Sequence, residues 1–67
     1  MMQNMMFMYA DLLRTIPYYK FVKVFDSDGS KLYEGSAGKA IPWENYAVST
    51  YYEDPREQLV VIQVKEV

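Results

Sequence analysis

The sequence predicts a small α+β domain, with an N-terminal helix on a four-stranded antiparallel sheet made of two hairpins. A helical repeat of apolar residues comes first and ends at a proline. Four short apolar or alternating segments follow, and turns containing Gly or Pro separate them. Short connections favour antiparallel neighbours, with the helix covering one face of the sheet. A small curved β-barrel with a helix is the alternative architecture.

The length of 67 residues allows a single domain, which we place at residues 8–67. Residues 1–7 are expected to form a flexible or dispensable N-terminus, because the five methionines of MMQNMMFM offer several translation starts. No positively charged segment precedes the apolar run Met5–Ala10, so no signal peptide is expected. That run is also too short to span a membrane. A cytoplasmic location is the expectation, and the absence of cysteine fits a reducing compartment.

The helix is predicted over Met5–Thr15, where apolar residues such as Leu12 and Ile16 recur at helical spacing. Pro17 should end it, because proline lacks a donor and keeps the preceding residue out of helical geometry. A further helical turn is expected at Ile41–Tyr46, with a proline near its start. The expected strands are Tyr19–Phe25, Lys31–Gly35, Ala47–Tyr52 and Leu59–Lys65.

The segment DSDG predicts a hairpin turn of type I followed by a left-handed glycine, Gly29. This turn fixes a register by setting Asp26 opposite Ser30. The resulting pairs are Phe25 with Lys31, Val24 with Leu32, Lys23 with Tyr33, and Val22 with Glu34. A two-residue turn at Asp28-Gly29 is the alternative, and it would place Tyr33 beside Val24.

The same region does not match known ligand loops. Counted from Asp26, glycine falls at the fourth position of a calcium loop instead of the sixth, and Ala37 replaces the closing glutamate. A phosphate-binding loop around Gly38-Lys39 would need a glycine where Tyr33 stands. GSAG has the GxxG spacing of a KH clamp, but a strand precedes it where a helix should. We therefore expect no metal and no cofactor.

No enzymatic activity is expected either. The chain has neither Cys nor His, and it contains no GxSxG or SxxK motif. The net charge of −2 also disfavours a general nucleic-acid binder, whose affinity comes from phosphate contacts.

Eleven aromatic residues are more than so small a core can enclose, so some should lie at an interface (Phe 3, Tyr 7 and Trp 1). Strand alternation places Val22 and Val24 inside. The candidate interaction face on the other side consists of Phe21, Lys23, Phe25, Lys31 and Tyr33. A protein partner or self-association is expected there. Single-stranded nucleic acid is the alternative, because aromatics and lysines also stack and neutralise nucleotides. The face could also pack on Trp43 and the tyrosines of the chain itself.

Four segments, MYADLLRTIP, VKVFDSDGSKLYEG, IPWENY and STYYEDPREQLVVIQV, carry a family resemblance. Together they resemble small uncharacterised proteins of phages, prophages and mobile elements of Gram-positive gut bacteria, over about residues 8–67. The resemblance implies a small intracellular accessory protein and supplies no catalytic residue. Three functions remain open: an accessory module that binds protein, a single-strand nucleic-acid binder, and a structural homodimer.

Overall fold

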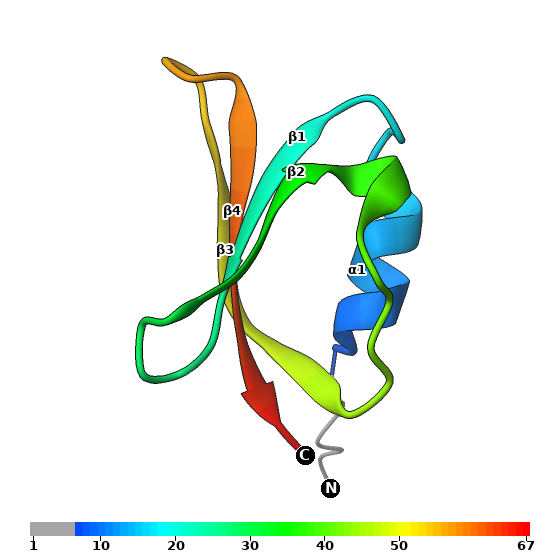
Figure 1. Ribbon diagram of the computed structural model, residues 1–67, viewed down its shortest axis with the longest axis vertical. Helices are drawn as coiled ribbons and strands as arrows, with labels where there is room; N and C mark the ends of the chain where they lie inside the picture. Colours follow the sequence, from blue (N-terminus) through cyan, green and yellow to red (C-terminus); the bar gives the residue numbers. More distant parts are fainter. Residues whose placement is uncertain (1–6) are drawn as a thin grey trace, which may run out of the picture.

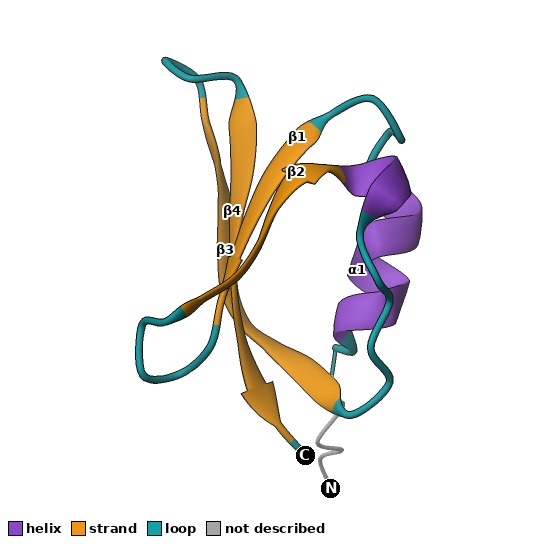
Figure 2. Ribbon diagram, in the orientation of Figure 1, coloured by secondary structure: helices purple, strands orange, loops and turns teal. Residues whose placement is uncertain are grey.

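The computed structural model describes residues 7–67, which form one helix and one open four-stranded sheet (Figures 1 and 2). The elements in chain order are α1 (Tyr9–Thr15), β1 (Phe21–Phe25), β2 (Lys31–Ser36), the 3-10 turn η1 (Ala37–Lys39), β3 (Tyr46–Asp54) and β4 (Leu59–Glu66). This is the predicted α+β class, and the open sheet excludes the barrel alternative for the described residues.

The prediction of an antiparallel sheet is wrong at its centre. The strand order is β2-β1-β4-β3, and β1 runs parallel to β4. Only the two outer pairs, β1 with β2 and β3 with β4, are antiparallel. Between them the chain runs along α1 from β2 to the start of β3 (Figure 1), so that β4 returns in the direction of β1. This order places β1 and β4, the two most apolar strands, in the interior of the sheet, where each has a strand on both sides.

The helix is shorter than predicted. Met5 and Met6 lie outside the described residues, but Phe7 and Met8 are not helical. The Val48 amide donates to the Phe7 carbonyl over 2.8 Å, and Met8 forms an antiparallel bridge with Ala47. Strand pairing therefore uses the backbone groups that the longer helix would have needed. The C-terminal end is as predicted, because Ile16, which precedes Pro17, is extended at φ −94°.

The second helical turn was placed wrongly. Ile41–Tyr46 is not helical, and the one short turn of this connection is η1, inside GSAGKA. The Gly38 amide donates to the Tyr18 carbonyl, 2.9 Å away, and a Cβ on Gly38 would lie 3.0 Å from the Tyr18 Cβ. Gly38, the second glycine of the GxxG spacing, thus allows this turn to pack closely on Tyr18.

The core lies between α1 and one face of the sheet. Tyr9, Leu12 and Leu13 of the helix pack on a set of buried residues from the sheet and from η1. That set is Val22, Val24, Ala37, Val60, Ile62 and Val64. The predicted alternation in β1 and β4 is thereby confirmed.

The DSDG turn forms as predicted, but the register of the hairpin does not continue as expected. Gly29 has φ 88°, and its amide donates to the Asp26 carbonyl at 3.0 Å. The Asp26 carboxylate oxygen Oδ1 accepts the amides of Asp28 and Ser30, each at 2.9 Å. Phe25 pairs with Lys31 as predicted, after which a bulge shifts the ladder.

Because of this bulge, Val24 lies opposite Tyr33 instead of Leu32, which is the pairing that the alternative two-residue turn predicted. Lys23 then pairs with Glu34, and Val22 pairs with Gly35, so the three inner pairs of the predicted register are wrong. Leu32 and Tyr33 both pack against the core. One extra residue in a strand lets two consecutive side chains share a face, which neither simple turn geometry allows.

Gly29→Val should destabilise the protein by about 1 kcal/mol or more, because a β-branched residue is forced to positive φ. A Cβ on Gly29 would meet no atom within 4 Å, so the effect comes from the backbone alone. Gly29→Asn should cost less, since Asn tolerates this conformation. Ser27→Ala is the control and should be nearly silent. Equal urea midpoints for Gly29→Val and Ser27→Ala would contradict the turn geometry.

Tyr9 gives the core a pH dependence. Its side chain is fully buried and stacks on Trp43, with ring centroids 5.6 Å apart. Among the described residues its hydroxyl has no hydrogen-bond partner. Burial, with a smaller contribution from Tyr33, raises the pKa of Tyr9 from 10.0 to about 12.

The folded state therefore holds the Tyr9 proton more tightly than the unfolded chain does, and this stabilisation is present below pH 10.0 and lost as the pH rises towards about 12. Tyr9→Phe should remove this part of the alkaline decline and leave neutral stability equal or higher, because an unpaired buried hydroxyl is removed. The measurement is the free energy of unfolding at a series of pH values. Tyr18→Phe, at an exposed position, should keep the decline. Identical alkaline profiles for wild type and Tyr9→Phe would refute this.

Candidate interaction surfaces

Among residues 7–67, no helix covers the second face of the sheet, and we call this face the open face (Figure 2). β1 presents Phe21, Lys23 and Phe25 there, because Val22 and Val24 point to the core. The register of the sheet adds neighbours from the other three strands. These are Lys31 and Glu34 of β2, Thr50 and Tyr52 of β3, and Leu59, Val61, Gln63 and Lys65 of β4.

Four of the five predicted residues share this face, and Tyr33 does not. The bulge turns Tyr33 towards the core, where its hydroxyl donates to the Ser36 carbonyl at 2.7 Å. A Cβ on Gly35 would lie 2.6 Å from that hydroxyl, so the glycine makes room for the ring. The prediction of Tyr33 as an interaction residue was based on the wrong register.

The open face is apolar at one end, in the row where β1 and β4 begin. Leu59 is only 6% exposed, although it stands outside the core cluster and no helix lies over it. It pairs with Phe21 on one side and with Asp54 on the other. Phe21 remains 44% exposed and Tyr52 58%. Side chains of the open face thus shelter one another and still leave aromatic surface in contact with water.

The charges on the open face are mixed. Lys31 donates a hydrogen bond to the Glu34 carboxylate across the bulge. This bond, together with the charges of Lys31 and Lys23, holds the pKa of Glu34 below its usual value. A carboxylate therefore lies among the lysines of β1 and β2, while Lys65 of β4 adds a third cation. The net charge of the open face is therefore less positive than a count of its lysines alone would indicate.

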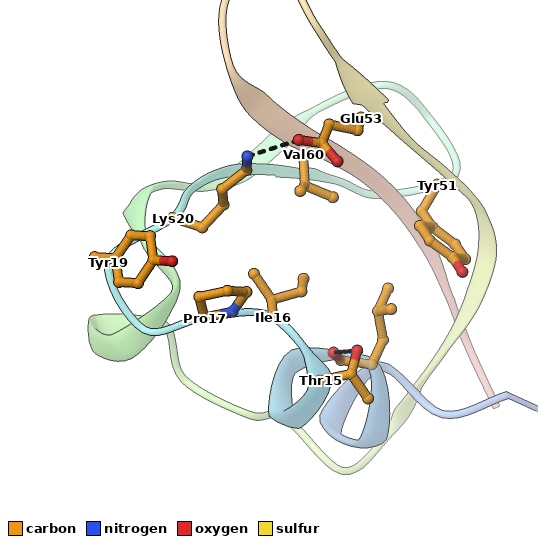
Figure 3. Close-up of a pocket in the computed structure, with 9 residues that line it drawn as sticks. Thr15, Ile16, Pro17, Tyr19, Lys20, Tyr51, Glu53 and Val60 are labelled. Atoms are coloured by element: carbon orange, nitrogen blue, oxygen red, sulfur yellow. Dashed lines mark hydrogen bonds and ion pairs between the residues drawn. The ribbon is translucent and has the colours of Figure 1, made fainter.

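The other side of the sheet carries an open groove of about 340 Å³ between β3 and the C-terminal end of α1. Leu12, Ile16 and Val60 supply its apolar wall, and Tyr51 stands on the β3 side (Figure 3). At the rim, Lys20 Nζ donates to Glu53 Oε2 over 2.6 Å. This groove was not predicted from the sequence, because its lining comes from separate segments that only the folded chain brings together.

Thr15, Lys20 and Glu53, which line the groove, already have polar partners. The Thr15 hydroxyl donates to the Leu12 carbonyl at 2.8 Å, and the ammonium of Lys20 is engaged with Glu53. The groove therefore offers apolar contact beside one ion pair. No catalytic nucleophile with an adjacent base is apparent among its lining residues.

Within residues 7–67, no group of three or more Asp and Glu residues is placed to hold a metal ion. Oδ1 of Asp26 is occupied by the amides of its own turn. In the same part of the chain, no helix is long and apolar enough to cross a membrane.

Comparison with protein-family models, with curated proteins and with solved structures finds no match for this chain. The two candidate surfaces are therefore defined by the geometry and chemistry of the chain itself.

We expect folding to need no metal, because the Asp26 carboxylate of the DSDG loop is committed to the turn. Thermal unfolding should have the same midpoint with added calcium, with added zinc and with a chelator. A fall of several degrees on chelation would show a metal site that the described residues do not reveal.

Proposed function

We propose that the protein is a small non-enzymatic interaction module that binds another protein through its open face. The observation that carries the proposal is the apolar end of a sheet face that residues 7–67 leave uncovered, with Phe21 44% exposed beside the sheltered Leu59. Contiguous exposed apolar surface is uncommon on soluble monomers, and where it occurs it often marks an interaction site. In keeping with the family resemblance, we propose an accessory role for a phage or mobile element, in the cytoplasm.

The charges define the chemistry of the partner. Lys23, Lys31 and Lys65 follow the apolar end along the same face, and Glu34 compensates part of their charge. A partner surface with apolar side chains and a few carboxylates at its border fits this pattern. Two open faces packed on each other would bring lysines towards lysines. We therefore place a different protein, rather than a second copy, on this face.

Single-stranded nucleic acid is the second candidate. Phe21, Phe25 and Tyr52 stand on one face together with three lysines, the combination on which bases stack and phosphates are neutralised. Glu34 is placed where a phosphate would be repelled, and this favours the protein partner.

Site-specific photocrosslinking tests the proposal. A photoreactive phenylalanine analogue at position 21 should form a discrete protein adduct in an extract of the source cells. The same analogue at position 18, an exposed tyrosine position outside the open face, is the matched control and should give no such adduct. Phe25→Ser should reduce the adduct, and nuclease treatment should leave it unchanged.

Adducts of equal yield from positions 18 and 21 would show non-specific contact and overturn the proposal. Nuclease-sensitive adducts, with salt-dependent binding of the purified protein to a labelled single-stranded oligonucleotide, would establish the second candidate instead.

A further inference from the structure

The outer edge of β3 begins with a strand partner and then continues without one. Its first residues pair with Phe7 and Met8, through the amide of Val48 and the bridge at Ala47. From Thr50 to Asp54, the pairings within the described chain are all on the β4 side. Among residues 7–67 this row of backbone donors and acceptors has no strand partner, and such a row is a template for another strand.

The two edges of the sheet differ in how they are protected. β2 has a bulge near its start, after Lys31, and both the bulge and the lysine discourage pairing. β3 has its bulge between Val48 and Thr50, before the free stretch. The five residues Thr50–Asp54 then contain no proline and no lysine. The β3 edge is therefore the one prepared for a further strand.

The stretch TYYED is complementary to itself in the antiparallel direction. Thr50 and Tyr51 carry hydroxyl donors, and Glu53 and Asp54 carry carboxylate acceptors, with Tyr52 between them. A two-fold axis at Tyr52 sets Thr50 opposite the partner's Asp54 and Tyr51 opposite the partner's Glu53. In each pair a hydroxyl meets a carboxylate, and no two like charges stand directly opposite.

The pleat of the strand agrees with this alignment. Thr50, Tyr52 and Asp54 pair with residues of the open face, whereas Tyr51 and Glu53 pair with Ile62 and Val60 of the core side. Opposed residues in an antiparallel pair point to the same face, and the alignment about Tyr52 satisfies this for all five positions. Shifting either copy by one residue would break the match.

We propose that two copies of this chain associate through Thr50–Asp54, joining their sheets into one continuous sheet. Phe7 and Met8 occupy the edge before this stretch and Pro55 ends it, so the new ladder is short. Both copies use the same patch, so the association closes at a dimer. The partner's Tyr51 then lies beside the Lys20–Glu53 pair at the mouth of the groove. This dimer leaves both open faces accessible and does not depend on the function proposed above.

Molar mass against concentration, measured by sedimentation equilibrium from micromolar to millimolar protein, should show a monomer–dimer equilibrium. Thr50→Asp places a carboxylate opposite the partner's Asp54 and should raise the dissociation constant at least about tenfold. Thr50→Lys creates two ion pairs per dimer and should lower the dissociation constant. Ser27→Asp, which adds the same charge on an exposed loop, should leave it unchanged. Circular dichroism confirms that each variant is folded.

A single cysteine tests the alignment directly, because the chain has none of its own. In Tyr52→Cys the two thiols face each other across the axis, so a disulfide-linked dimer should form rapidly under mild oxidation. Tyr18→Cys, at a position 76% exposed, is the control and should form it slowly. A wild-type protein that stays monomeric throughout would overturn the proposal. A dimer that ignores the charge at position 50, equal oxidation of the two cysteine variants, or open-ended association would overturn it as well.

Discussion

The parallel pairing of β1 with β4 is the contact on which the rest of this structure depends. Both strands alternate, and side by side they place Val22 and Val24 next to Val60 and Ile62 under the helix. The same register sets Phe21 beside Leu59 on the opposite side. One pairing therefore creates both the core and the apolar end of the open face. It also assigns β2 and β3 to the edges.

Local chemistry explains the parts of the fold that the sequence could predict. Proline at position 17, the DSDG turn and the alternation of β1 each act within a few residues, so the helix end, Gly29 and the inward valines were recognisable. The central parallel pair was not, because two strands separated by most of the chain carry no local mark of their direction. The start of the helix was mispredicted for the same reason, because Phe7 and Met8 pair with β3, which is distant in sequence.

The candidate site shows the same division. Phe21, Lys23, Phe25 and Lys31 follow from alternation and the turn, and their placement on one face is confirmed. Tyr33 was predicted on the wrong face because of the bulge in β2. This bulge is a single extra residue, and no glycine or proline in the sequence indicates it. Val61 could have been found, because the alternation of Val60, Ile62 and Val64 already placed it on the other side. Its position next to Lys23 depended on the unpredicted parallel pairing.

The size of α1 explains why two surfaces remain uncovered. Seven residues of helix span about 10 Å at 1.5 Å per residue, whereas the nine residues of β3 span about 30 Å at 3.3 Å per residue. The helix therefore covers one face of the sheet and reaches only part of its length. Beyond the end of α1, the chain turns at Pro17 and leaves the groove between Ile16 and Tyr51. Thr50–Asp54, the stretch of β3 whose outer edge has no partner among residues 7–67, begins beside this groove, after the bulge that follows Val48. A chain with one short helix and four strands must leave apolar surface exposed at such places, and contact with another molecule is the remaining way to remove that surface from water.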